Sequence, residues 1–362
     1  MSVVYIIEQN AAVSKEGNRL VVKKDGAVLH SIQTFKVDQV VVVGNVFLTP
    51  SAIKHLLHNE IDTTFMTVHG KYLGRLQPLH SKNILLRRQQ FQRADDLTFS
   101  LQAAKTIVKG KLMNMRTILM RLNRSRERLD ISNQILAIRM MLDKVDSAES
   151  LDILLGYEGR GTTLYFEGFS QSILSDDLTF SRRIRRPPTD PVNAMLSLGY
   201  TLLFNTVMAM VNMAGFDPYL GFLHAAEYGR PSLPLDLMEE WRSVIIDTLV
   251  LSIINLKVLT KDDFTVKTIT DKEPAADINE DRSENESSAG NTSEDSNALP
   301  VVLTDGGFRK YITQFERKMS QQIQYPLNGQ TLTYRDCIKE QVYHFARYIK
   351  GEDKEYIPIA LK

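Results

Sequence analysis

The chain has 362 residues, of which 43% are hydrophobic, and this is enough for one large domain or two smaller ones. Its single cysteine, Cys337, excludes an internal disulfide and a cysteine-rich zinc site, and it is typical of a reducing cytoplasm. The formal net charge is only +1. No uninterrupted apolar run reaches the roughly 18 residues of a membrane span, and no basic segment of the kind that opens a signal peptide precedes the first apolar run. We therefore expect a cytoplasmic protein without a membrane segment.

Residues 1 to about 85 have the pattern of short strands. Two runs with high β propensity, Arg19–Lys24 and Ala27–Ile32, flank Asp25-Gly26, which predicts a hairpin with a type I′ turn. Thr49 followed by Pro50 favours a short helix that ends near His58, because the pair supplies an N-cap and a first-turn proline. Further strands are expected at Val3–Glu8, Phe35–Val43 and Ile61–Val68.

From about Ser81 onward the apolar residues recur with helical spacing. Leu97 to roughly Arg128 reads as one long helix or two abutting ones. Further helices are expected at Ile131–Val145, Ser147–Ser172, Pro191–Gly215, Leu237–Leu256 and Gly307–Lys350. The sequence therefore predicts an α+β protein, with a small N-terminal β domain over residues 1–85 and a larger helical domain over residues 86–362.

An acidic stretch interrupts the helical part at about residues 271–298. Between Asp271 and Asn297 it holds nine acidic and two basic residues, no aromatic residue, and Ile278 as its only large aliphatic residue. Such a segment buries too little apolar surface to offset its ordering entropy, so we predict that it is disordered and dispensable for the chemistry. The rest of the chain has 42 basic against 34 acidic residues, as a polyanion-binding surface requires.

Three separated segments carry polar groups suited to chemistry. Glu158 lies on the apolar stripe of its expected helix, so its carboxylate needs a cation, a hydrogen-bond donor or a proton. His224 follows a loop rich in proline and glycine, and Asp236 and Glu239 share one face of the next helix. The alternative interpretations are a helix-end glutamate paired with an arginine, a core histidine, and ordinary first-turn carboxylates.

Carboxylates and one imidazole form a hard donor set that suits Mn²⁺ or Mg²⁺ better than structural zinc. Such a cation could neutralise a phosphodiester oxygen and orient an attacking hydroxyl. Two arginine clusters could hold the phosphates, or could simply be solvated surface. They comprise Arg182, Arg183, Arg185 and Arg186, and the group Arg116, Arg121, Arg124, Arg126 and Arg128.

Four segments in order resemble the signature blocks of the CRISPR-associated Cas-one integrase family. They are Gly156–Gly159, Arg186–Ser197, Gly221–His224 and Ser232–Glu239. The turns at Val43–Val46 and Gly70–Gly74 are similar to those of the family's β domain, and the stretch from Thr331 to Pro358 resembles its C-terminal block. The acidic insert departs from the family's pattern.

The resemblance implies a metal-dependent DNA endonuclease and integrase, with Glu158, His224 and Glu239 as metal ligands and Asp236 as a second acidic position beside them. Asn193 matches the family's asparagine block near the active site, so we expect it at the DNA. From their charge alone, we also expect the two arginine clusters to face the DNA, with Arg124 and Arg128 among the contacts. The implied partners are double-stranded DNA (prespacer and CRISPR repeat), a second copy of the chain bound through the β domain, and the small Cas-two protein.

Two other functions are compatible with the same residues. The chain could be a nucleic-acid-binding scaffold without catalysis, although the intact set of Glu158, His224, Asp236 and Glu239 disfavours that. It could also be a repair nuclease that acts on branched DNA.

Overall fold

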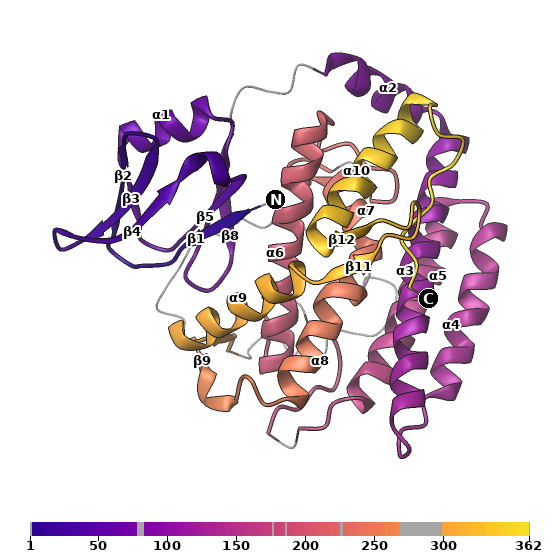
Figure 1. The fold of residues 1–362 in the computed structure, drawn as a ribbon. Coiled ribbons are helices and arrows are strands. Elements are labelled where there is room, and N and C mark those ends of the chain that lie inside the picture. The colour runs from indigo at the N-terminus through magenta and orange to yellow at the C-terminus, as the bar shows by residue number, and fades with distance from the viewer. Residues whose placement is uncertain are drawn as a thin grey trace. The chain divides into compact units, whose positions relative to one another are not determined.

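The computed structural model describes residues 2–77, 83–175, 177–184, 187–224, 227–267 and 299–361. The chain divides into two compact units, Met1–Lys82 and Asn83–Lys362. The first unit is built from strands and one α-helix, and the second is mainly helical (Figure 1). This confirms the expected α+β class. The predicted acidic insert lies outside the described residues.

The N-terminal unit contains two four-stranded sheets and helix α1 (Pro50–His58). One sheet has the order β1-β5-β7-β8, in which β1, β5 and β7 are parallel and β8 is antiparallel. The other has the order β4-β3-β2-β6. The strands are β1 (Val3–Ile6), β2 (Ala12–Glu16), β3 (Arg19–Lys24), β4 (Ala27–Gln33), β5 (Gln39–Val43), β6 (Phe47–Leu48), β7 (Asp62–Met66) and β8 (Tyr72–Leu76), with a 3₁₀ turn, η1, at Thr34–Lys36.

The local signals in this unit act as the sequence predicts. Asp25 and Gly26 both have positive φ, 50° and 81°, and Lys24 pairs with Ala27, so β3 and β4 are joined by the expected two-residue turn. The Thr49 hydroxyl caps α1 by accepting a hydrogen bond from the N–H of Ala52. Alternate residues of the strands, with Ala52 and Leu56 of α1, form the unit's core.

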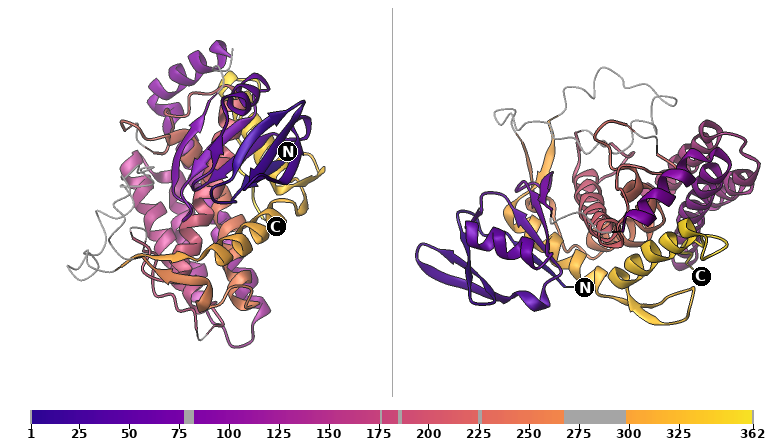
Figure 2. Two further views of the ribbon diagram at one scale, coloured as in Figure 1. Left: turned by 90° about the vertical axis from the view of Figure 1, so that its left-hand side faces the viewer. Right: turned by 90° about the horizontal axis from the view of Figure 1, so that it is seen from above.

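The second unit begins with α2 (Ile84–Asp95), α3 (Leu97–Ser125), α4 (Ser132–Lys144), the 3₁₀ turn η2 (Val145–Ser147) and α5 (Leu151–Gln171). The long helix expected from Leu97 is continuous, and Asp96 caps it by accepting hydrogen bonds from the N–H groups of Thr98 and Phe99. Helices α3, α4 and α5 pack against one another (Figure 2). This packing places the middle of α3 beside the middle of α5.

Helix α6 (Pro191–Ala214) lies in the core of this unit. Asp190 caps its start, and Gly215 ends it with φ 93°. Among the described residues it is the helix long and apolar enough to cross a membrane, but 89% of that apolar window is buried inside the protein, as in the core helix of a globular fold.

Helix α7 (Ser232–Trp241) continues through a π-helical segment, η3 (Arg242–Asp247), into α8 (Thr248–Asn255). The sequence predicted one α-helix that opens after Pro234 and continues to Leu256, so the start at Ser232 and the π segment are new findings. π-helical turns inside α-helices are frequent at functional sites. Here the segment directly follows Glu239 and its two neighbours, Glu240 and Trp241.

The C-terminal part contains the 3₁₀ turn η4 (Lys261–Asp263), β9 (Phe264–Val266), β10 (Val301–Leu303), α9 (Asp305–Met319), β11 (Gln322–Gln324), β12 (Thr331–Thr333) and α10 (Tyr334–Lys350). The expected helical stretch Gly307–Lys350 is therefore two helices. The β11–β12 hairpin separates them, because the chain turns at Gly329, with φ 70°, and the Thr333 hydroxyl caps a new helix.

Candidate active site

Glu158 lies at the packed side of α5, at 1% exposure. Its Oε1 accepts hydrogen bonds from the ammonium of Lys111 on α3 and, at 2.8 Å, from the hydroxyl of Thr162 one turn later. Gly161 allows α3 to approach this closely, since a Cβ there would lie 2.4 Å from a methyl carbon of Leu112. The glutamate on an apolar stripe thus has both a cation and a donor, as its burial requires.

The loop that carries His224 is organised by Asp236. Both carboxylate oxygens of Asp236 accept backbone N–H groups, from Phe222 at 2.5 Å and from Leu223 and His224 at 3.0 Å. The imidazole Nδ1 of His224 lies 2.7 Å from Asp236 Oδ1. Gly221 is required next to this carboxylate, because a Cβ would lie 2.6 Å from Asp236 Oδ2. Asp236 therefore fixes the loop and the orientation of the histidine ring.

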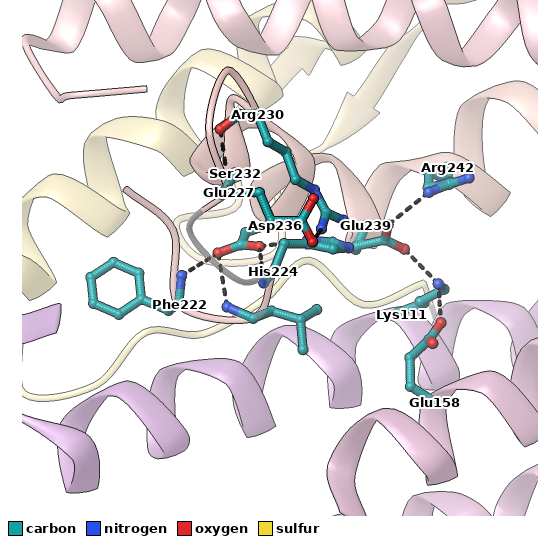
Figure 3. A network of polar contacts seen from close by, with 11 residues as sticks. Lys111, Glu158, Phe222, His224, Glu227, Arg230, Ser232, Asp236, Glu239 and Arg242 are labelled. Atoms are coloured by element: carbon teal, nitrogen blue, oxygen red, sulfur yellow. Dashed lines mark hydrogen bonds and ion pairs between the residues drawn. The ribbon is translucent and has the colours of Figure 1, made fainter. Parts of the chain in front are cut away.

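Glu239 lies one turn after Asp236 on α7, at 1% exposure. Its Oε1 accepts a hydrogen bond from Nη1 of Arg242 at 2.7 Å, and its Oε2 lies 2.7 Å from Nζ of Lys111. Figure 3 shows the resulting series of contacts from Arg242 through Glu239 and Lys111 to Glu158. The two glutamates, which are far apart in sequence, thus share one ammonium.

Arg242 connects this cluster to a further buried carboxylate, Asp247. Its guanidinium carbon lies 4.2 Å from the ring centroid of Tyr200, and the Tyr200 hydroxyl donates to Asp247 Oδ1 at 2.6 Å. Burial raises the pKa of Asp247 to about 6 and raises that of Tyr200 as well. The π segment brings both Arg242 and Asp247 to the same tyrosine.

Glu240, the neighbour of Glu239, fastens the C-terminal tail to α7. Its carboxylate accepts hydrogen bonds from the Tyr356 hydroxyl at 2.6 Å and from the Ile359 N–H at 2.5 Å. Burial raises the pKa of Glu240 to about 8. The amide of Asn114 on α3 donates to the carbonyls of Glu240 and Ile359. These contacts fix α7, and with it Glu239, relative to α3.

The donor set suits a hard divalent cation. The buried carboxylates of Glu158 and Glu239 both contact the Lys111 ammonium. The Nδ1 of His224 is held by Asp236, and a histidine held in this way by a carboxylate is a common metal ligand. Within the described part of the chain, however, no group of three or more His, Cys, Asp and Glu side chains is assembled to hold a metal ion. The convergence of Glu158, His224 and Glu239 on one metal ion therefore stays a prediction.

The residues expected at the DNA fall into different environments. Arg182, Arg124 and Arg128 are exposed at the surface, while Arg185 and Arg186 lie outside the described residues. Arg124 lines a groove of about 530 Å³ between α3 and α4, together with Arg116, Met120, Asn123, Ser132, Ile135, Leu136 and Arg139. Its charged groups are three arginines, so the groove suits an anion.

Arg183 and Asn193 are hydrogen-bonded to each other inside the second unit. Asn193 is 0% exposed, and its Oδ1 accepts hydrogen bonds from Nη1 of Arg183 and from the Ile184 N–H, both at 2.9 Å. Its amide nitrogen donates to the Arg182 carbonyl and to Asp190. This amide fixes the 182–184 segment to the start of α6 and has no exposed surface to offer to DNA.

Sequence reasoning missed Lys111, Arg242 and Glu240. Lys111 had the same signal that selected Glu158, since it lies on the stripe formed by Ile107, Val108 and Met115. A buried charge on an apolar stripe could therefore have identified both partners. Arg242 and Glu240 lacked such a signal, because the π segment and the C-terminal tail decide their environments.

Together these observations define a two-unit α+β protein with a buried candidate site for a hard divalent cation. The sequence profile described as "CRISPR associated protein Cas1" matches residues 4–271, so the chain belongs to the Cas1 family. The "CRISPR-associated endonuclease Cas1 3" of Thermus thermophilus is 33% identical over 100% of this chain and 98% of its own length. The "CRISPR-associated endonuclease Cas1 1" of Chlorobaculum tepidum is 31% identical over 99% of this chain and 98% of its own length.

Solved structures share the fold. A "Casposase bound to integration product" superposes with a TM-score of 0.80 at 22% identity, over 98% of this chain and 92% of its own. A CAS1 protein from Thermotoga maritima superposes with a TM-score of 0.76 at 19% identity over the full length of both chains. A chain of a "Cas6-RT-Cas1--Cas2 complex" gives 0.79 at 23% identity, over 100% of this chain and 36% of its own.

Proposed function

We propose that the protein is a metal-dependent DNA endonuclease and integrase that inserts spacer DNA into a CRISPR array. The proposal rests on one observation: the buried carboxylates of Glu158 on α5 and Glu239 on α7 both contact the ammonium of Lys111, and the Asp236–His224 pair lies beside Glu239. Full-length relatives named as CRISPR-associated endonucleases support it.

In the proposed reaction the 3′-oxygen of a spacer end forms a bond to the phosphorus of a repeat phosphodiester. The bond from that phosphorus to the repeat's own 3′-oxygen breaks, and this oxygen leaves as a 3′-hydroxyl after gaining a proton, while the attacking hydroxyl loses its proton. A Mn²⁺ or Mg²⁺ ion held by Glu158, His224 and Glu239 would neutralise charge on the phosphate when bound. Asp236 orients the His224 ring, and Arg242 holds Glu239 in place.

The proposed partners are double-stranded DNA, a second copy of the chain and the small Cas2 protein. A structural neighbour is named as a complex that includes Cas1 and Cas2, and another is named as bound to an integration product, which supports the first and third of these. The surface arginines Arg124, Arg128 and Arg182 would contact phosphates. A cytoplasmic location follows from this function, because the DNA to be modified is there.

The test is half-site integration of a labelled duplex into a repeat-bearing plasmid, with Cas2 and Mn²⁺ present. Glu158→Ala and His224→Ala should each abolish joining and cleavage, because each removes a proposed ligand. Glu167→Ala is the matched control, since Glu167 is exposed on the same helix as Glu158. Near-normal joining by either site variant would contradict the proposal. Cleavage of branched DNA without any joining would instead indicate a repair nuclease.

A further inference from the structure

Lys111 is a buried ammonium between two buried carboxylates. Its side chain is 2% exposed, and it projects from α3 to Glu158 on α5 and to Glu239 on α7 (Figure 3). An isolated lysine charge at this depth would be strongly unfavourable, and so would either carboxylate alone. Lys111 therefore stabilises the charged forms of both glutamates, and Glu239 has Arg242 as a second cationic partner.

The charges along the series of contacts from Arg242 to Glu158 are balanced. Lys111 and Arg242 supply two positive charges, and Glu158 and Glu239 supply two negative ones. A divalent cation bound to both glutamates beside an unmoved ammonium would add two positive charges to these four residues, and buried charge without added partners is costly.

The Lys111 ammonium also occupies the position between the two carboxylates that a bound cation would need. The Lys111 nitrogen lies 2.7 Å from Glu239 Oε2 and is within ion-pair contact of Glu158 Oε1. Oxygen ligands lie at about 2.0–2.6 Å from Mg²⁺ or Ca²⁺, so a cation bound to both carboxylates would need nearly the same place as the ammonium.

We propose that Lys111 is a positioning residue that acts as an internal counter-ion of the site. Its ammonium holds Glu158 and Glu239 together while no divalent cation is bound, and it leaves this position when one binds. The flexible four-carbon stem of lysine permits such a movement without displacement of α3. This inference rests on the proposed function, and it explains why the described residues do not form a ready-made metal cluster.

The first measurement is thermal unfolding in EDTA for wild type, Lys111→Met, Glu158→Gln and the double variant. Lys111→Met should lower Tm by several degrees, because both carboxylates lose their shared cation. Glu158→Gln should lower Tm less in the Lys111→Met background than in wild type, because the two charges depend on each other. Lys109→Met is the control, since Lys109 is half-exposed on the same helix and pairs with the exposed Asp146. Its Tm should match that of wild type.

The second measurement is the affinity for Mn²⁺ alone, obtained from the free-Mn²⁺ signal in electron paramagnetic resonance or by calorimetry. Lys111→Met should bind Mn²⁺ about tenfold more tightly than wild type or better, because no buried ion pair has to be broken. It should also show a larger rise in Tm on addition of Mn²⁺. If Lys111→Met does not fold, Lys111→Gln keeps an N–H donor for Glu158 without the charge, and the same gain in affinity is expected.

The failures of the two proposals can be told apart. If wild type binds Mn²⁺ but the Lys111 variant binds it equally or more weakly, the counter-ion role is overturned and the proposed function stands. If Glu158→Gln binds Mn²⁺ as tightly as wild type, or if neither wild type nor the Lys111 variant binds it, both the metal assignment and the counter-ion role are overturned.

Discussion

Asp247 is a buried carboxyl group that lies beside the candidate site without belonging to its ligand set. Burial raises its pKa from 3.8 to about 6, and the hydrogen bond from Tyr200 and the nearby Arg242 oppose this shift. Because the pKa is higher in the folded than in the unfolded protein, its contribution to stability is fully present below about pH 4. It is lost as the pH rises through about 6.

This shift predicts a pH dependence that one substitution removes. Between pH 4.5 and 7.5 the free energy of unfolding of wild type should fall by about 2 kcal/mol relative to Asp247→Asn, which does not ionise. The asparagine Oδ1 can still accept the Tyr200 hydroxyl. Urea unfolding of both proteins in EDTA at several pH values measures the difference. A constant difference across this range would contradict the shifted pKa.

Some site residues could be predicted from the sequence because their own helix placed them. Glu158 is one, since its position on an apolar stripe follows from the spacing of Leu151, Leu154 and Tyr165. Its partner could not be derived in that way. The ion pair of Glu158 with Lys111 depends on how α5 packs on α3, and helix spacing alone does not state which helices meet.

At the scale of elements, glycines set how closely α5 approaches α3. A Cβ on Gly161 would lie 2.4 Å from Leu112, and a Cβ on Gly168 would lie 2.9 Å from Leu119. Gly159, on the same helix, has no atom within 4 Å of a built Cβ. The first two glycines therefore serve the packing of the two helices, and the third does not.

Alanine at Gly161 and at Gly159 should have opposite effects. Gly161→Ala should destabilise the protein by about 1–3 kcal/mol, because the added methyl group overpacks the contact with Leu112. Gly159→Ala should stabilise it by roughly 0.5–1 kcal/mol, since glycine is a poor helix former and the space is open. Chemical denaturation compares the two with wild type. Equal effects would show that α3 and α5 are not held by this contact.

Element boundaries were predictable where a cap fixed them. Pro191 and Gly215 bound α6 in the structure as the sequence indicates, and Thr49 caps α1, which begins at Pro50. The β11–β12 hairpin escaped prediction, because its two strands have only three residues each and pair with each other. Segments this short have too few residues to show a period.

At the scale of the whole molecule, the site depends on segments that lie far apart in the sequence. Glu158 and Glu239 are separated by 81 positions, and Lys111 lies 47 positions before Glu158. Composition and periodicity do not predict contacts between residues so far apart in the sequence. The resemblance of ordered blocks to the Cas1 family suggested that Glu158, His224 and Glu239 belong together, and the three-dimensional fold added Lys111.

The uneven charge distribution of the molecule leads to a prediction about DNA binding. Replacing Arg124 and Arg128 together by alanine should weaken duplex binding and make the slope of log affinity against log salt shallower, by about 0.9 for each phosphate that the variant no longer neutralises. Fluorescence anisotropy at several salt concentrations measures this slope. Lys23→Ala is the control, because Lys23 already pairs with Glu16 at 2.5 Å. An unchanged slope in the arginine variant would show that the two side chains are only solvated.

The π segment Arg242–Asp247 also affects how this chain should be aligned with its relatives. Each hydrogen bond of a π-helix encloses one residue more than that of an α-helix, so the segment holds more chain than an α-helix of equal length. A relative that is α-helical throughout would need a one-residue gap here. Without that gap, every position beyond Asp247 would be assigned a face rotated by about 100°, and core residues of α8 would be compared with surface residues.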